Sequence, residues 1–248
     1  MPNQRVKQIL AILATAGVIV INYLAAKGYI NSRTPEYISD QYPTVVTPAG
    51  YAFTIWSLIY LGLIVFSIYQ TLPKNAEKFV RVRSLYIQSC VANCLWIYLW
   101  HYEQILGSLA VIFLLLGILF LINSNLLQYN STTDFWLVRV PFNIYFGWVT
   151  VAALVIFMVA LVYLGVQLSD FLTTVLACLL LIIATIAGIV FRFKLANAAY
   201  PLTVAWALTA IAVKQGGRTA IVTVCAFAVI ALLFFALYGF IQTKSKPR

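Results

Sequence analysis

The sequence predicts an all-α protein, a polytopic membrane helix bundle with about eight transmembrane helices. Of its 248 residues, 63% are apolar and 9% are charged, whereas soluble domains average roughly 45–50% and about 25%. One crossing of a bilayer needs roughly 20 apolar residues, so the apolar residues suffice for about eight crossings. These proportions exclude a soluble enzyme, a disordered chain, a collagen and a disulfide scaffold.

Eight long stretches without Asp, Glu, Lys or Arg mark the predicted helices. Each is long enough to cross a bilayer, and because lipid offers no hydrogen-bond partner to the backbone, each crossing should be helical. The stretches also lack the apolar and polar alternation of barrel strands. They are residues 8–26, 41–73, 84–102, 104–133, 140–169, 171–191, 195–213 and 219–243.

The first stretch follows Arg5 and Lys7 and has two interpretations. It could be a secretory signal cleaved after Leu24-Ala25-Ala26, or an anchor that is retained. This largely apolar run of 19 residues is long for a signal, so we expect a retained anchor.

The first loop, residues 27–47, is the longest on its side of the membrane. It contains Pro35 and Pro43, together with Tyr37 and Tyr42. Loops of this length often act as lids. A plain connector is the equal alternative.

The seventh stretch, residues 195–213, is the weakest candidate for a crossing. Pro201 falls in its first turn and leaves only 13 residues up to Val213. A re-entrant or kinked segment is the alternative, and it would move the C-terminus to the other side of the membrane.

The charged residues predict the orientation. The net charge is +10, and the cations lie at the edges of the apolar stretches, where anionic lipids and the insertion machinery favour them. They do not form the single basic stripe that is typical of nucleic-acid binding. With eight crossings, twelve Lys and Arg fall on the side of the N-terminus and four on the other. We therefore expect both termini in the cytoplasm, in a bacterial inner membrane or a photosynthetic membrane.

The predicted spans contain no charged residue, which argues against a proton-driven transporter, a carboxylate acid and base pair or a metal cluster. The four cysteines lie in apolar stretches without a CxxC pair, so we expect small buried residues without a metal or redox role. They are Cys90, Cys94, Cys178 and Cys225.

His101 is the only histidine and lies at the end of the third stretch. It could be an axial ligand to a haem or a chlorophyll. We favour an interfacial histidine between Trp100 and Tyr102. A catalytic triad that needs a second imidazole is excluded, and we predict no catalytic residue.

Three predicted helix faces combine aromatic rings with uncharged polar groups at the i, i+3 and i+4 spacing. They could be simple packing surfaces between helices. The functional alternative is a pocket for a flat, mostly apolar ligand, which rings would stack on and a few polar groups would orient. The faces are Phe53, Trp56 and Tyr60; Ser89, Asn93, Trp96 and Trp100; and Tyr145 and Trp148.

At these residues the chain resembles the tryptophan-rich sensory protein (TspO/MBR) family, which includes the mitochondrial translocator protein. The order of the motifs and their helix placement agree with that family over residues 8 to about 163. The motifs are Pro48-Ala-Gly-Tyr-Ala-Phe-Thr-Ile-Trp56-Ser-Leu-Ile-Tyr60, Asn93-Cys-Leu-Trp96 and Pro141-Phe-Asn-Ile-Tyr145-Phe-Gly-Trp148.

The resemblance implies a five-helix membrane core, residues 1–165, followed by three additional helices in residues 166–248. Family members are often dimeric and bind porphyrins and sterol-like lipids, with a debated light-dependent breakdown of porphyrin. The resemblance therefore implies a tetrapyrrole or a lipid as bound ligand, in a pocket beneath the outer loop. A carotenoid is a further candidate, from the possibility of a pigment-containing complex. The residues we expect to line the pocket are Phe53, Trp56, Tyr60, Asn93, Trp96, Trp100, Tyr145 and Trp148.

The chain also departs from that family. Tyr37, Tyr42 and Tyr51 stand where compact members have tryptophans, which puts indole photochemistry in doubt, and no Lys or Arg follows Tyr163 before Asp170, which leaves sterol recognition without support. In the additional helices, the small residues at 184 and 188 would let one helix pack closely on a partner.

Two other functions stay open beside ligand binding in a sensory or carrier role. One is a transporter of an uncharged metabolite, and the other is a structural subunit of a pigment-containing membrane complex. The expected partners are membrane lipid, an apolar small molecule and a second copy of the chain or a larger membrane complex, without nucleic acid. An enzyme is the least supported function.

Overall fold

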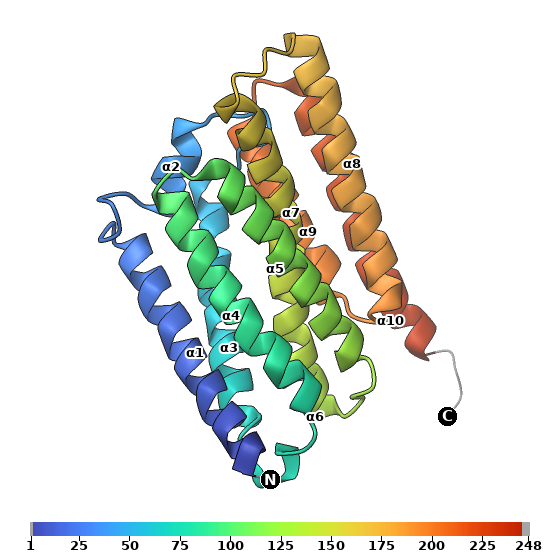
Figure 1. Ribbon diagram of the computed structural model, residues 1–248. Helices are drawn as coiled ribbons and strands as arrows, with labels where there is room; N and C mark the ends of the chain where they lie inside the picture. The colour runs from blue at the N-terminus through green and yellow to red at the C-terminus, as the bar shows by residue number, and fades with distance from the viewer. Residues whose placement is uncertain (1, 245–248) are drawn as a thin grey trace. The chain divides into compact units, whose positions relative to one another are not determined.

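The computed structural model describes the backbone of residues 2–244, and this part of the chain consists of helices and turns without strands. The predicted all-α bundle is therefore confirmed. The long helices are α1 (Pro2–Ala26), α3 (Ile55–Tyr69), α4 (Val80–His101), α5 (Ile105–Leu126), α7 (Val140–Tyr163), α8 (Asp170–Lys194), α9 (Ala199–Lys214) and α10 (Thr219–Lys244) (Figure 1). The short ones are α2 (Pro35–Gln41), η1 (Gly50–Thr54), η2 (Pro73–Asn75), α6 (Thr132–Asp134) and η3 (Phe135–Arg139).

Six helical segments of the described chain are long and apolar enough to cross a membrane. The protein is thus an integral membrane protein of several spans. The other two predicted crossings are the helices α4 and α9, and their crossing stays a prediction. Helix α9 has 16 residues, a length of about 24 Å against a hydrocarbon core of about 30 Å. The six segments are Gln4–Ala26, Gly50–Tyr69, Ile105–Leu126, Thr132–Tyr163, Asp170–Lys194 and Thr219–Tyr238.

The chain forms two compact units, each built from two segments. Unit 1 comprises Met1–Gln41 and Ile55–Phe142, and unit 2 comprises Tyr42–Thr54 and Asn143–Arg248. The first loop is therefore divided, with its first part in unit 1 and its second part in unit 2. Neither unit ends at residue 165, and a family core that ends there stays a prediction.

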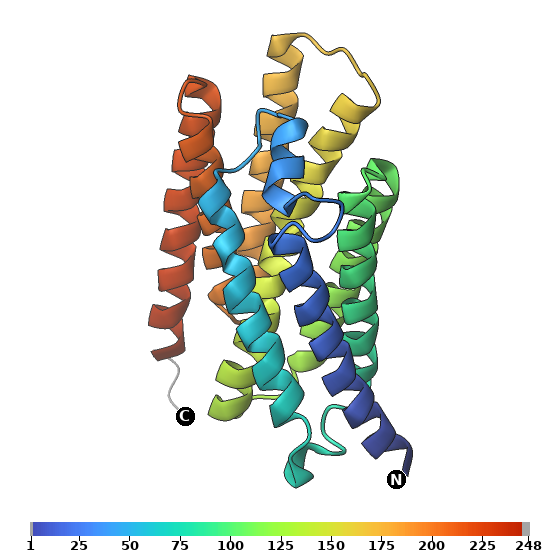
Figure 2. The same cartoon turned by 90° about the vertical axis from the view of Figure 1, so that its left-hand side faces the viewer.

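In unit 1, α1 packs against α3 and α4, and α5 packs against α4 (Figures 1 and 2). Buried polar side chains recur every seven residues along α1, and each forms hydrogen bonds with α4 or with the end of α3. Lipid gives no hydrophobic drive for helices to associate, so packing and such hydrogen bonds hold them together. These bonds join α1 to α3 and α4 within unit 1, and its retention as an anchor stays a prediction. The partners are Gln8 with Gln70, Thr15 with Ser67 and Tyr86, and Asn22 with Asn93.

In unit 2, α10 packs against α8 and α9, and close approaches occur at small residues. A side chain at Gly188 of α8 would meet Leu232 of α10. The partner of the predicted small-residue step is thus α10 of the same chain. Gly147 of α7 lies equally close to α9, because a Cβ there would be 2.8 Å from the carbonyl oxygen of Tyr200.

The helix that contains α7 begins earlier than the predicted residue 140. Ser131 caps its first turn by accepting a hydrogen bond from the backbone N–H of Asp134, and residues Phe135–Arg139 form a π-helical turn. Pro141 explains this turn, because proline has no N–H to donate to the carbonyl group four residues before it. The wider turn inserts one residue at this point of the helix.

Candidate functional site

The aromatic row of unit 1 is formed by Tyr60, Trp56, Trp96 and Trp100, which follow one another with nearly parallel rings. The centroids of Tyr60 and Trp56 are 5.4 Å apart at an interplanar angle of 16°. Those of Trp56 and Trp96 are 6.1 Å apart at 28°. Those of Trp96 and Trp100 are 6.2 Å apart at 18°. These distances lie in the range of favourable ring pairs.

Helical spacing builds the two halves of the row. Trp56 and Tyr60 lie four residues apart on α3, and Trp96 and Trp100 lie four residues apart on α4, so each pair shares one helix face. The contact between Trp56 and Trp96 then joins the two helices. The row thus brings together four of the eight predicted ligand residues.

The indole N–H groups of the row differ in their partners. Trp100 Nε1 donates to the carbonyl oxygen of Pro35 in α2 at 3.2 Å. Trp96 is 4% exposed, and its Nε1 is buried without a hydrogen-bond partner in the described residues. A buried donor left unsatisfied costs about 1–3 kcal/mol. The Trp96 indole is therefore the polar group of the row that a ligand could satisfy.

The two polar residues beside the row on α4 both have hydrogen-bond partners, one on α1 and one within α4. Asn93 Oδ1 accepts a hydrogen bond of 2.8 Å from Asn22 Nδ2 of α1, and Ser89 Oγ donates to the carbonyl oxygen of Tyr86 at 2.7 Å. Asn93, predicted as a ligand residue, therefore has a structural contact in this structure.

His101 is the last residue of α4 and is completely buried. Its Nδ1 donates to the carbonyl oxygen of Ile97 at 2.8 Å, and its own carbonyl oxygen accepts from Asn31 Nδ2 at 2.8 Å. The bond from Asn31 ties the end of α4 to the first loop. Groups of three or more His, Cys, Asp or Glu side chains that could hold a metal do not occur in the described part of the chain.

The other three predicted residues lie in unit 2. Phe53 of η1 and Trp148 of α7 have ring centroids 6.0 Å apart at 75°, an edge-to-face pair. Tyr145, one turn before Trp148, is 1% exposed. Unit 1 therefore gathers Trp56, Tyr60, Asn93, Trp96 and Trp100, and unit 2 holds the remaining three. A single pocket lined by all eight stays a prediction.

Unit 2 also contains a small apolar cavity. Its volume is about 10 Å³, which is room for one water molecule, and its lining includes none of the eight predicted residues. It is far smaller than the roughly 300–1,000 Å³ of a typical ligand pocket. The lining residues are Val46, Val151, Leu154, Val155, Leu180, Leu181, Ala184, Leu208 and Ile211.

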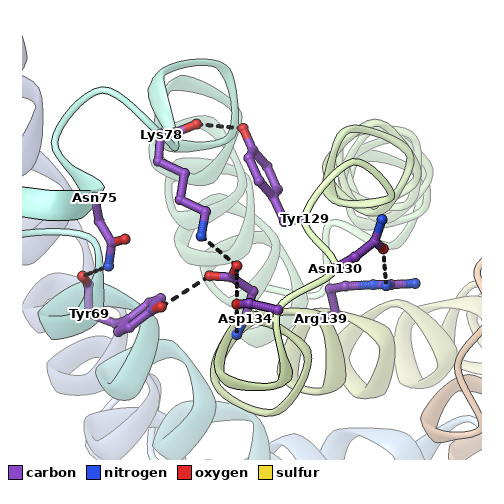
Figure 3. A network of polar contacts seen from close by, with 8 residues as sticks. Tyr69, Asn75, Lys78, Tyr129, Asn130, Asp134 and Arg139 are labelled. Carbon is purple, nitrogen blue, oxygen red and sulfur yellow. Dashed lines mark hydrogen bonds and ion pairs between the residues drawn. The ribbon is translucent and has the colours of Figure 1, made fainter.

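The sequence did not predict the polar cluster around Asp134, shown in Figure 3. Asp134 is 1% exposed, and its carboxylate forms an ion pair with Lys78. It also accepts hydrogen bonds from Tyr69 OH at 3.1 Å and from Ser131 Oγ at 2.5 Å. The one signal in the sequence is the spacing of Ser131 and Asp134, a capping pattern in which a hydroxyl and an acidic residue lie three apart.

Neighbouring groups close this cluster. Tyr129 OH donates to the carbonyl oxygen of Lys78 at 2.5 Å, and burial raises the pKa of this phenol, which stays protonated as a donor. Asn75 Nδ2 donates to the carbonyl oxygen of Tyr69 at 2.8 Å. Next to this cluster, the Arg139 guanidinium donates to Asn130 Oδ1 at 3.3 Å (Figure 3). Because these donors and acceptors are mutually paired, the cluster connects helix ends and presents no nucleophile.

A family model described as TSPO-like protein matches residues 8–238. The chain belongs to the TSPO-like protein family. Comparison with curated proteins and with solved structures gave no match.

The TSPO-like match changes one expectation from the motifs. We expected the resemblance to end near residue 163, whereas the match continues to residue 238 and includes α8, α9 and most of α10. The last three helices are thus part of the family pattern. The three motifs identified the family correctly but underestimated its extent, because helices α8 to α10 contain no short motif comparable to those around Trp56 and Trp96.

Proposed function

We propose that this TSPO-like protein binds a flat, mostly apolar molecule of the tetrapyrrole type at the aromatic row of unit 1, in a sensory or carrier role. The observation that carries the proposal is the buried Trp96 indole, which lies within a row of nearly parallel rings and has an N–H without a partner.

The chemistry of the row fits such a ligand. Aromatic rings offer flat apolar contact area, and an oxygen acceptor on the ligand would supply the hydrogen bond that Trp96 Nε1 lacks. The row lies on stretches without Asp, Glu, Lys or Arg, residues 55–69 of α3 and 84–101 of α4, which favours an apolar molecule over an ion. A porphyrin with carboxylate or carbonyl substituents combines a flat apolar body with a polar edge.

In the proposed arrangement, the aromatic row lies near one face of the membrane. Trp56 lies near the start of α3, shortly after the first loop. Trp100 lies near the end of α4, and its indole donates to Pro35 of that loop. If both termini are cytoplasmic, this loop and the row lie on the opposite side. A bacterial inner membrane or a photosynthetic membrane, and a dimer or larger complex, belong to the same proposal.

The test is a titration of the protein in lipid nanodiscs with protoporphyrin IX, followed by the porphyrin absorption band so that the signal does not depend on the number of tryptophans. We expect saturable binding to the wild type. Trp96→Phe keeps an aromatic ring but removes the N–H and part of the stacking area, and should weaken binding about tenfold, from the loss of roughly 1–2 kcal/mol.

The matched control is Trp136→Phe, because Trp136 is 61% exposed and lies outside the row. It should bind like the wild type. Equal affinity of Trp96→Phe and the wild type, or no saturable binding to either, contradicts the proposal.

A further inference from the structure

Residues 42–54 comprise the end of the first loop and the short helix η1 that follows it. This segment is held by α9, and we call it the strap. The backbone N–H of Ala49 donates to the carbonyl oxygen of Ala210 at 2.9 Å. Trp206 Nε1 donates to the carbonyl oxygen of Ala52 at 3.3 Å. The rings of Tyr51 and Trp206 meet edge to face with centroids 5.2 Å apart. Three separate contacts of unit 2 thus fix the strap to α9.

Gln215, which follows the last turn of α9, adds a two-point contact. Its Nε2 donates to the carbonyl oxygens of Thr44 and Thr47, each at 3.1 Å. Both protons of one amide group are therefore used to hold the strap. A carboxylate of the same shape could not form either bond, since it has no proton to donate.

The turn that Gln215 holds is already closed by its own bonds. The backbone N–H of Thr44 donates to Thr47 Oγ1 at 2.9 Å, and the N–H of Thr47 donates to the carbonyl oxygen of Thr44 at 3.2 Å. Losing Gln215 therefore removes two hydrogen bonds between this turn and the end of α9 and leaves the turn's own bonds in place.

The strap carries part of the predicted ligand site. Phe53 lies on it and packs against Trp148 in unit 2. The strap ends at Thr54, and the chain continues directly into Ile55 and Trp56 of α3. Whatever fixes the strap therefore fixes Phe53 and the segment that leads into the aromatic row.

We propose that Gln215 is a positioning residue, through which α9 clamps the strap and so slows the entry and release of the ligand. The inference rests on the proposed function and gives a regulatory role to the C-terminal helices. Gln215 acts through the strap and does not itself contact the ligand.

The first experiment needs no ligand. Hydrogen–deuterium exchange is measured on the full chain in nanodiscs for peptides that cover the strap. Gln215→Glu should exchange about tenfold faster there, because two hydrogen bonds of ordinary strength are lost. Gln215→Lys retains a donor and should restore most of the protection.

The matched control is Gln128→Glu, which makes the same charge change at an exposed glutamine whose Nε2 donates to the carbonyl oxygen of Asn125 at 3.1 Å. Its strap should exchange like the wild type. The clamp is overturned if the strap of Gln215→Glu exchanges deuterium at the wild-type rate. It is also overturned if Gln128→Glu accelerates exchange in the strap as much as Gln215→Glu does.

The second experiment measures protoporphyrin IX release by stopped flow. We expect release from Gln215→Glu to be at least about fivefold faster, with Gln215→Lys and Gln128→Glu near the wild type, since the strap opens more often. If deuterium exchange in the strap is faster but porphyrin release is unchanged, the clamp has no role in the entry and release of the ligand. If the wild type binds no porphyrin, the proposed function fails and this role with it, while fast strap exchange in Gln215→Glu alone still supports the clamp.

Discussion

At the scale of single residues, the Asp134 side chain joins several segments of unit 1. Its buried carboxylate accepts from Lys78, Tyr69 and Ser131, which come from three separate segments of the chain. Removing one partner of a buried ion pair leaves the other charge uncompensated. One carboxylate therefore joins the end of α3, the segment before α4 and the start of the helix that contains α7.

Asp134→Asn should lower the free energy of unfolding by about 1–3 kcal/mol, because the amide keeps the shape but cannot neutralise Lys78. The measurement is the thermal unfolding midpoint in detergent. Asp170→Asn is the control, because the Asp170 carboxylate is 80% exposed in its pair with Arg218 and should contribute roughly 0–0.5 kcal/mol. Equal effects of the two substitutions would argue against a special role for Asp134.

The sequence could not predict this cluster from residue types alone. Asp134 and Lys78 are 56 residues apart, and each stands beside a loop, where a charge ordinarily faces water. The tertiary packing of α3, α4 and the start of α7 brings them together. By contrast, the pairs Trp56 with Tyr60 and Trp96 with Trp100 could be predicted, because each lies four residues apart on one helix.

At the scale of elements, the close approach of α7 to α9 depends on Gly147. A Cβ there would lie 2.8 Å from the backbone oxygen of Tyr200 and 3.0 Å from the Cβ of Thr203. Backbone atoms of a packed helix cannot move aside as the end of a flexible side chain can. Thr150 Oγ1 and Tyr200 OH form a hydrogen bond of 2.8 Å across the same interface.

Gly147→Ala should therefore lower the free energy of unfolding by about 1–3 kcal/mol through overpacking. Gly117→Ala is the matched control, because no atom lies within 4 Å of a Cβ built there, and alanine favours the helix by about 0.5–1 kcal/mol. Its unfolding midpoint should be unchanged or higher. A Gly147→Ala protein as stable as the wild type would show that α7 and α9 are less tightly packed than described.

The existence of the helices could be predicted, while their ends could not. Lipid forces a long uncharged stretch to be helical, so charge-free stretches identify the helices. The stretch 41–73 nevertheless yields a helix only from Gly50 onwards, because its first residues form the strap. The π-helical turn before Pro141 is likewise local geometry that charge patterning does not indicate.

At the scale of the whole molecule, the distribution of cations sets the expected orientation. Twelve Lys and Arg on the side of the N-terminus against four on the other favour cytoplasmic termini. Helix α9 is decisive, because it has 16 residues and is not among the six segments that are long and apolar enough to cross a membrane. If α9 does not cross, the two termini lie on opposite sides.

Reporter fusions test this orientation. A green fluorescent protein fused to the C-terminus should fluoresce, and alkaline phosphatase fused at the same place should be inactive, because the C-terminus is expected in the cytoplasm. The reverse pattern would show that the chain crosses an odd number of times. A fusion after residue 194 serves as the internal reference, since the loop between α8 and α9 is expected on the cytoplasmic side as well.

The site as a whole is predicted only in part. The aromatic spacing and the motifs identified the rings. The contact between Trp56 and Trp96, however, joins two residues that are 40 positions apart in the chain, which no local pattern specifies. The role of α9 in holding the strap was missed as well, because Gln215 is an ordinary polar residue after a helix end until its two carbonyl partners are known.

The most direct test of the ligand site is the nuclear magnetic resonance signal of the Trp96 indole N–H. The chain has six tryptophans, and the Trp96→Phe protein assigns the signal by its disappearance. On adding protoporphyrin IX, the Trp96 signal should shift downfield as its N–H gains an acceptor, while the signal of exposed Trp136 stays in place. A Trp96 signal that does not move while porphyrin binds would contradict the site at the aromatic row.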